Sequence, residues 1–241
     1  MRVALMVTCL VDQFFAPAGM DAVRLLRSLG CEVEFPPGQT CCGQPAFNAG
    51  YRDEARRMAL HTLDAFEGAE AVVLPSGSCT AMVRIHYLEL FAGDGPDLRR
   101  AEALASRTYE LAEFLVKVLG VQALGGGLRG RRVAYHHGCH ALRGLGLREE
   151  PLALLRNAGA EIANWPAAQE CCGFGGVFAV KFPEVSAAMA DRKLDTLPAA
   201  DLLTSADPGC LLHLKGRMAR RGFPLPVKHL AEVLWEARRE T

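Results

Sequence analysis

Hydrophobic residues along the chain form short continuous runs that alternate with helical stripes. The segment RVALMVT, residues 2–8, is an almost unbroken apolar run of the kind found in buried strands. The spacing of Met20, Val23, Leu26 and Leu29 then predicts a helix. Further strands are expected at 32–35 and 71–74, and further helices at 52–66, from Cys79 onward, and at 106–119.

The second half of the chain repeats this order of elements. Its segments RRVAYHH (131–137), EIANW (161–165) and DLLTSA (201–206) are expected to be strands. The segments LLRSLGCEVEFP (25–36) and LLRNAGAEIANWP (154–166) both fit a helix end, a glycine stop and a short strand closed by proline. Because strands alternate with helices, we predict an α/β fold of two pseudo-symmetric repeats, each a parallel sheet flanked by helices.

A glycine-rich segment separates the two halves. The stretch LGGGLRG, residues 124–130, has the composition of a flexible connection. We therefore expect a first repeat domain at 1–124, a linker at 125–130 and a second repeat domain at 131–241.

The cysteines follow the same repeat. The segments QTCCGQP and QECCGFG place Cys41 and Cys42 130 positions before Cys171 and Cys172. Cys9 lies 130 positions before Cys139, and Cys79 lies 131 before Cys210. With nine cysteines in 241 residues, four matches at nearly one offset indicate an internal repeat rather than chance.

The repeated cysteines all follow predicted strands. In a parallel sheet the carboxyl ends of the strands share one edge, where α/β folds build their sites. Four thiols from each half should therefore converge there, and the fourth of each set, which opens a helix, is favoured as a thiolate. The eight expected metal ligands are Cys9, Cys41, Cys42, Cys79, Cys139, Cys171, Cys172 and Cys210.

Two neighbouring cysteines can reach one centre only from an irregular loop, because consecutive strand residues point to opposite faces. Gly43 and Gly173 follow the cysteine pairs and would permit a positive φ and a close backbone approach. Four thiolates suit zinc or an iron–sulfur cluster, and the long gaps between these cysteines favour the cluster. Cys31 has Ala160 as its repeat mate and is expected to pack in the core instead.

Several other side chains flank the cysteines. His136, His137 and His140 surround Cys139, and we select His137 as a candidate to tune a bound centre, against the alternative that these histidines are ordinary residues at a strand end. Ser76 and Asp207 lie three residues before the last cysteine of each set. They are either spare ligands or helix N-caps, and capping is the preferred interpretation.

Composition narrows the class of protein. Half of the residues are hydrophobic, and Lys plus Arg equals Asp plus Glu at 27 each, so the charge balance gives no reason to expect a nucleic acid partner. No apolar run is long enough for direct membrane insertion, and the first residues fit a strand better than a signal peptide. We therefore expect a cytoplasmic protein, in which cysteines serve as metal ligands or redox groups rather than as disulfides.

The pattern Cys-x(31)-Cys-Cys-Gly-x(about 35)-Cys, present twice, resembles the cysteine-rich CCG domain family over nearly the whole chain. Members of this family include subunits of heterodisulfide reductase and glycolate oxidase, and lactate utilisation proteins, to which this chain is most similar. The resemblance implies one or two iron–sulfur clusters, of [4Fe–4S] type, with zinc possible in the first site.

The resemblance also implies a function. It is that of an electron-transfer component of a system oxidising lactate or a related 2-hydroxy acid, a redox subunit rather than a complete enzyme. Its partners would be other iron–sulfur or flavin subunits of a lactate or glycolate oxidation complex. The alternatives are a thiol–disulfide reductase subunit and a zinc-held scaffold. The fullest family pattern has a further cysteine where this chain has Ser76 and Asp207, so the reductase chemistry is not carried over.

The two cysteine pairs are followed by different loops. The second has the sequence CCGFGG, whereas the first has CCGQPA, in which Pro45 offers no N–H group. More backbone N–H groups directed at a cluster raise its potential. We therefore expect the second site to bind the redox-active cluster, and the first to hold zinc, a labile cluster or nothing after aerobic purification.

Overall fold

The computed structural model describes residues 1–239, and the chain divides into two compact units, Met1–Leu111 and Ala112–Thr241. Each unit contains a four-stranded sheet in which every pair of neighbouring strands is parallel. The predicted α/β fold with two repeats is therefore confirmed. The linker predicted at 125–130 lies within the second of these units and stays a prediction.

The first unit alternates strands with helices along its length. In chain order its elements are β1 (Arg2–Leu5), α1 (Cys9–Phe14), α2 (Ala16–Ser28), β2 (Glu32–Glu34), α3 (Gln44–Asn48), α4 (Arg52–Ala65), β3 (Val72–Leu74), α5 (Gly77–Ala81), the π-helical turn η1 (Met82–His86), α6 (Tyr87–Leu90), α7 (Gly95–Ala105) and β4 (Thr108–Glu110).

The second unit has the same order of strands. Its elements are α8 (Leu111–Glu113), which begins at the boundary, then η2 (Phe114–Val118), β5 (Arg132–Tyr135), η3 (His140–Gly144), α9 (Glu150–Asn157), β6 (Glu161–Ile162), α10 (Val177–Lys181), α11 (Pro183–Asp195), β7 (Leu202–Ser205), α12 (Pro208–Arg220), β8 (Val227–His229) and α13 (Leu230–Arg239).

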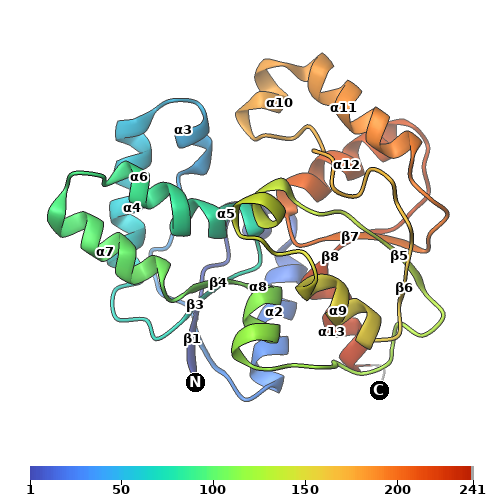
Figure 1. Ribbon diagram of the computed structural model, residues 1–241, viewed down its shortest axis with the longest axis horizontal. Coiled ribbons are helices and arrows are strands. Elements are labelled where there is room, and N and C mark those ends of the chain that lie inside the picture. The colour runs from blue at the N-terminus through green and yellow to red at the C-terminus, as the bar shows by residue number, and fades with distance from the viewer. Residues whose placement is uncertain (240–241) are drawn as a thin grey trace. The chain divides into compact units, whose positions relative to one another are not determined.

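The strand order places the start of each repeat in the middle of its sheet. The orders are β2-β1-β3-β4 and β6-β5-β7-β8, so the chain moves outward in both directions from the two central strands. Right-handed crossovers then put the connecting helices on opposite faces. In the first unit α2 lies on one side of the sheet and α4, α6 and α7 lie on the other (Figure 1). The central pair is the topological switch point, where α/β sheets bind ligands.

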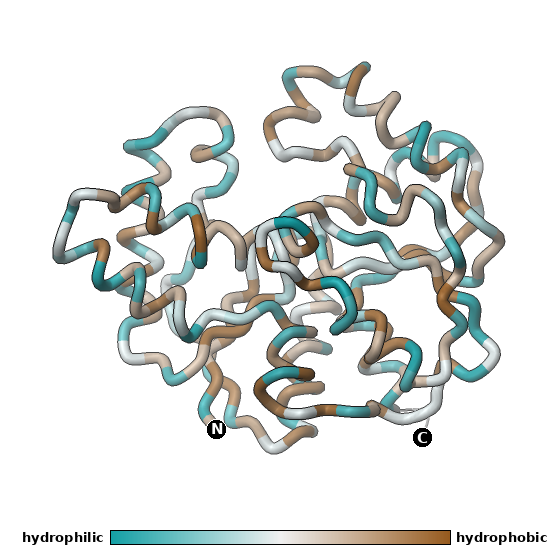
Figure 2. The backbone as a smooth tube through the Cα atoms, viewed as in Figure 1, coloured by the Kyte–Doolittle hydropathy of each residue, from teal (hydrophilic) through white to brown (hydrophobic). Residues whose placement is uncertain are grey.

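The two sheets also share their register. Ala4 pairs with Val72 in the first sheet, and Ala134 pairs with Leu203 in the second, at almost the same offset as the cysteines. The central strands β3 and β7 are buried along their whole length, which explains their continuous apolar sequences. The helices carry alternating hydrophobic and hydrophilic stretches, as expected for helices that cover a sheet (Figure 2).

One predicted element is partly wrong. The helix expected over 106–119 begins only at Leu111, because Thr108–Glu110 forms β4 and pairs with β3, with Tyr109 opposite Val73. A β-branched and an aromatic residue suit a strand, and the pairing partner lies more than thirty residues earlier in the chain, where local periodicity cannot detect it. Helix α7 and strands β4 and β8 were not anticipated. Among the described residues, no helix has the length and hydropathy needed to cross a membrane.

Candidate metal centres

The first cysteine site (Cys9, Cys41, Cys42 and Cys79) lies beyond the carboxyl ends of β1, β2 and β3. Cys9 is the first residue of α1, which follows β1, and Cys79 lies in the first turn of α5, which follows β3. Cys41 and Cys42 lie in the loop between β2 and α3. Since β1 and β3 are neighbours at the switch point, these three loops meet at one edge of the sheet.

The four thiols of the first site form one connected set. The Sγ atoms of Cys9 and Cys41 are 3.6 Å apart, and Cys42 makes side-chain hydrogen bonds with both Cys41 and Cys79. Cys9, Cys41 and Cys42 therefore converge as the sequence predicted. Their role as metal ligands stays a prediction.

The second cysteine site (Cys139, Cys171, Cys172 and Cys210) repeats this arrangement around β5 and β7. Cys139 makes a side-chain hydrogen bond with Cys171, and Cys172 makes hydrogen bonds with Cys171 and Cys210. Cys210 lies in the first turn of α12. Each unit thus builds its own four-thiol set from residues that are far apart in sequence.

The glycines after the cysteine pairs have the backbone conformation that the sequence predicted. Gly43 and Gly173 both have φ of +88°, a region that favours glycine. A Cβ atom on Gly173 would lie 2.6 Å from the carbonyl oxygen of Ser186, so this position also has no room for a side chain. The Gly173 and Phe174 N–H groups donate to the Sγ atoms of Cys171 and Cys172, both at 3.4 Å.

In each site, hydrogen bonds from neighbouring thiols lower the pKa of one cysteine. Hydrogen bonds from Cys42 and then Cys9 lower the pKa of Cys41 to about 3, and those from Cys139 and Cys172 lower the pKa of Cys171 to about 2. The pKa of Cys9 is raised, first by its hydrogen bond to Cys41 and then by burial. Cys41 and Cys171 are therefore the thiolates of the two sites, and a thiol with a raised pKa, such as Cys9, needs a bound cation to lose its proton. The hydrogen bond with Cys172 lowers the pKa of Cys210, but burial and the charge of Asp207 outweigh it and raise that pKa, so the thiolate expected at the start of α12 is not found.

The two candidate caps differ. Ser76 is the N-cap of α5 and accepts a hydrogen bond from the Cys79 N–H at 3.3 Å, as predicted. Asp207 is the N-cap residue of α12, but within the described chain its side chain makes no capping hydrogen bond, so that part of the prediction is wrong. Its carboxylate instead fills the space beside Gly138. The pKa of Cys139 is raised mainly by its hydrogen bond with Cys171 and by burial, and the charge of Asp207 adds a smaller effect in the same direction.

The adjacent histidines face different surroundings. The ring of His137 packs edge-on against the ring of Tyr135, with 4.8 Å between the ring centroids, and His137 lines a hollow of about 500 Å³. The ring of His136 is completely buried, and one of its nitrogens lies within 4.8 Å of the Sγ atoms of Cys172 and Cys210. Burial lowers the pKa of His136 to about 3, so this ring is neutral. A tuning role for His137 stays a prediction.

Lys193 is a charged residue near the second site that sequence reasoning missed. It is buried in α11, where its Nζ donates to the carbonyl oxygens of Ala167 and of Glu170, the latter at 3.1 Å, and lies 4.2 Å from the ring centroid of Trp165. Burial lowers its pKa to about 8, while the charges of Cys172 and other thiols oppose this shift. An apolar helix face interrupted by one lysine was the signal available in the sequence.

Cys31 lies away from the first cysteine site. It comes directly before β2, at the edge of the sheet opposite to the cysteine loops, and it is buried. Its N–H donates to the carbonyl of Leu26 at 3.1 Å, and the N–H of Ala160 donates to Leu155 at the same distance. Cys31 and Ala160 thus occupy equivalent positions in the two cores. That Cys31 binds no metal stays a prediction.

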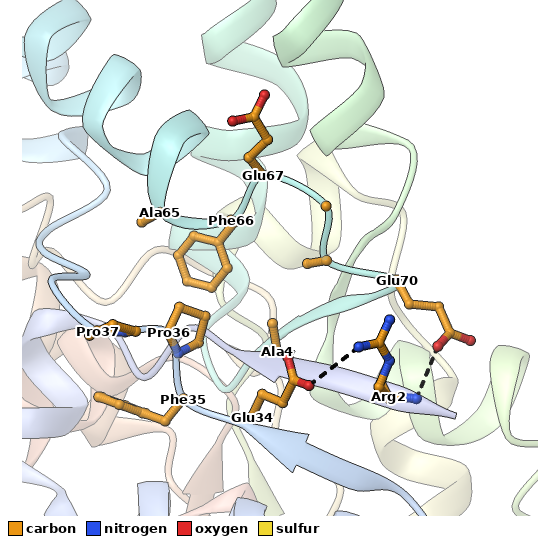
Figure 3. Close-up of a pocket in the computed structure, with 12 residues that line it drawn as sticks. Arg2, Ala4, Glu34, Phe35, Pro36, Pro37, Ala65, Phe66, Glu67 and Glu70 are labelled. Carbon is orange, nitrogen blue, oxygen red and sulfur yellow. Dashed lines mark hydrogen bonds and ion pairs between the residues drawn. The ribbon is translucent and has the colours of Figure 1, made fainter.

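The first unit also contains a hollow of about 370 Å³ that has a different character (Figure 3). It lies beside Arg2, whose guanidinium pairs with Glu34 at 3.7 Å and whose N–H donates to Glu70 at 3.1 Å. Apolar residues including Phe35 and Phe66 complete its wall. Because it is lined by neither cysteine nor histidine, it offers no ligand for a soft metal.

The sequence matches a known family in both units. The cysteine-rich domain family CCG matches residues 3–84 and again residues 133–215. Lactate utilization protein A of Geobacillus sp. (strain WCH70) is 47% identical over 237 residues, which cover 97% of this chain and 99% of that protein. The proteins of the same name from Shouchella clausii (strain KSM-K16) and Geobacillus kaustophilus (strain HTA426) are each 48% identical, with 97% of this chain and 98% of theirs covered.

Proposed function

Because the chain belongs to the cysteine-rich CCG domain family, together with lactate utilization protein A, we propose that it is an iron–sulfur electron-transfer component of a system that oxidises lactate or a related 2-hydroxy acid. The observation that carries this proposal is the convergence of four thiols at the switch point of each sheet. The substrate class rests on the name of the relatives.

The residues of both sites fit such a cluster. Each set offers four thiols, and each already stabilises one of them as a thiolate. Backbone N–H groups are directed at sulfur in the second site, as they are around iron–sulfur clusters. A [4Fe–4S] cluster bound there would accept and donate single electrons, and zinc in the first site would supply structure only.

The chain's own residues have three tasks in this proposal. The cysteines give up their protons to bind iron, and binding should therefore weaken as the pH falls. The N–H groups of the cysteine loop stabilise negative charge on sulfur. The buried ammonium of Lys193 does the same from the side of α11.

The oxidation of the substrate itself requires partners. The sequence contains no flavin or nicotinamide fingerprint, so we assign hydride or electron removal from the 2-hydroxy acid to other iron–sulfur or flavin subunits. We assign this assembly to a reducing, cytoplasmic setting, in which cysteines serve as metal ligands or redox groups rather than as disulfides.

Thiol–disulfide exchange is a second candidate function. It is favoured by one observation, the 3.6 Å contact between the Sγ atoms of Cys9 and Cys41. Two thiols this close can form a disulfide without a large backbone movement. Oxidation of this pair by air would remove two thiols from the first site, so we expect that site to lose its metal after aerobic handling.

The test is anaerobic purification followed by iron and sulfide analysis, with visible spectra before and after dithionite. We expect about four iron and four sulfide ions per occupied site and absorbance that bleaches on reduction. Zinc in both sites with no iron would instead indicate a scaffold. Turnover of a small disulfide by the isolated protein would favour the second candidate.

A further inference from the structure

The His136 side chain contains a buried nitrogen that has no hydrogen-bond partner among the described residues. This atom is Nε2, and the residue has no exposed surface. A buried polar atom is almost always paired with protein, water or a bound ion. A metal ion bound beside Nε2 would provide the partner that this nitrogen lacks.

The other ring nitrogen fixes which tautomer is present. His136 Nδ1 lies 3.3 Å from the carbonyl oxygen of Ala168, and a carbonyl can only accept, so Nδ1 carries the proton. Nε2 of the neutral ring then presents a lone pair. This is the arrangement of metal-binding histidines, which commonly donate their second N–H to a backbone carbonyl.

The neighbours of His136 are the sulfurs of the second site. Three buried residues each place one ligand atom within 4.8 Å of the other two: His136, Cys172 and Cys210. Imidazole nitrogen and thiolate sulfur together bind zinc and iron.

The first repeat has a different residue at this position. Met6 follows β1 as His136 follows β5, and their N–H groups donate to equivalent carbonyls, those of Val73 and Thr204, at 3.0 and 2.9 Å. A thioether replaces the imidazole there. Of these two equivalent positions, only the one in the second site therefore carries a nitrogen donor.

We propose that His136 is a metal ligand of the second site, binding through Nε2 alongside Cys172 and Cys210. The two sites then differ in donor chemistry, nitrogen plus sulfur in the second and sulfur alone in the first. This inference rests on the metal binding of the proposed function but not on electron transfer or on lactate.

The experiment loads the metal-free full-length chain with ¹¹³Cd²⁺ and measures scalar coupling between cadmium and ¹⁵N-labelled histidine rings. We expect one cadmium ion coupled to Nε2 of one histidine. The His136→Leu variant, which keeps the volume and removes the nitrogen, should lose the coupling and bind cadmium at the second site at least about tenfold more weakly. The Met6→Leu variant is the matched control and should keep both.

Two further measurements keep the inference testable if His136→Leu fails to fold. In the otherwise native chain, His137→Gln and His140→Gln should each leave the coupling in place. Absence of any cadmium–histidine coupling, loss of it in either of these variants, or no cadmium at the second site would overturn the inference. Coupling in a chain that never assembles an iron–sulfur cluster would leave it standing while the proposed function fails.

Discussion

Cys31 and Ala160 occupy equivalent positions in the two repeats, so the second repeat already contains the substitution that tests Cys31. We expect Cys31→Ala to keep the full metal content, because the residue lies at the edge of its sheet away from the cysteine loops. Losing one buried sulfur should reduce the free energy of unfolding by about 1 kcal/mol. Iron analysis and urea unfolding measure the two effects, with Cys41→Ser as the comparison. Equal loss of metal in both variants would contradict the assignment.

Cys41 and Cys171 should be the reactive thiols of the metal-free protein. Hydrogen bonds from Cys42 and Cys9, and from Cys139 and Cys172, lower their pKa values to about 3 and about 2. Both therefore remain thiolates from pH 8 down to pH 5.5, and their alkylation rates should stay nearly constant over this range.

An ordinary thiol loses reactivity by about 100-fold or more over the same pH interval, because its thiolate fraction falls. Burial raises the pKa of Cys31, which serves as the internal control and should react slowly and only at high pH. Mass spectrometry of iodoacetamide-labelled peptides reads each site. A steep pH dependence at Cys41 and Cys171 would refute the assignment of these two residues as hydrogen-bonded thiolates.

Alanine substitutions at two glycines in equivalent loops can distinguish the cost of a steric clash from the cost of backbone strain. Gly43 and Gly173 have the same φ of +88°, but a Cβ atom would meet its nearest neighbour at 3.3 Å in the first loop and at 2.6 Å in the second. Gly173→Ala should therefore cost about 1–3 kcal/mol more than Gly43→Ala in free energy of unfolding, since the strain is common to both. Denaturation of the metal-free variants, followed by circular dichroism, provides the comparison. Equal costs would mean that the loop relaxes around the added methyl group.

Helix α11 connects the cysteine loop of the second unit to a buried charge. Lys193 donates to the carbonyls of Ala167 and Glu170, which lie just before Cys171. Lys193→Met should destabilise the protein by about 2 kcal/mol because these carbonyls lose their donor. It should also make the reduction potential of the second-site centre more negative, on the order of tens of millivolts, because a positive charge favours the reduced form.

Thr62 provides the matched control for Lys193. It occupies the equivalent position in α4, where its hydroxyl donates to the Met58 carbonyl at 3.1 Å. Thr62→Val should leave the potential of the second-site centre unchanged in a redox titration. An unchanged potential in Lys193→Met as well would show that its charge does not act on the centre.

For the whole molecule, the two sites are expected to differ in function. The second site is surrounded by the N–H groups of Gly173 and Phe174, the ammonium of Lys193 and the imidazole of His136. We predict that Cys172→Ser abolishes the reducible paramagnetic signal of the anaerobic protein, whereas Cys42→Ser retains it and loses at most the metal of the first site. Iron content and electron paramagnetic resonance give the answer. The reverse pattern would assign the redox centre to the first site.

The sequence by itself determined the repeat, the α/β class and the convergence of the repeated cysteines. Strand and helix periodicities are local properties, and the common offset of the cysteines is visible without coordinates. Since parallel strands end at one edge, placing Cys9, Cys41 and Cys79 after strands was enough to predict that they meet. The positive φ of Gly43 and Gly173 was predicted from the cysteine pairs before them, because two neighbouring thiols can reach one centre only from an irregular loop.

Only the tertiary structure decided the elements and side chains that depend on distant partners. Strand β4 exists because β3 pairs with it, although its sequence continues into a helix. Consecutive residues after a strand point to opposite sides, so a difference of one position separates His136, which faces the sulfurs, from His137, which packs against Tyr135. Lys193 can be buried because the loop more than twenty residues earlier supplies the carbonyls that its ammonium needs, and no local pattern records that pairing.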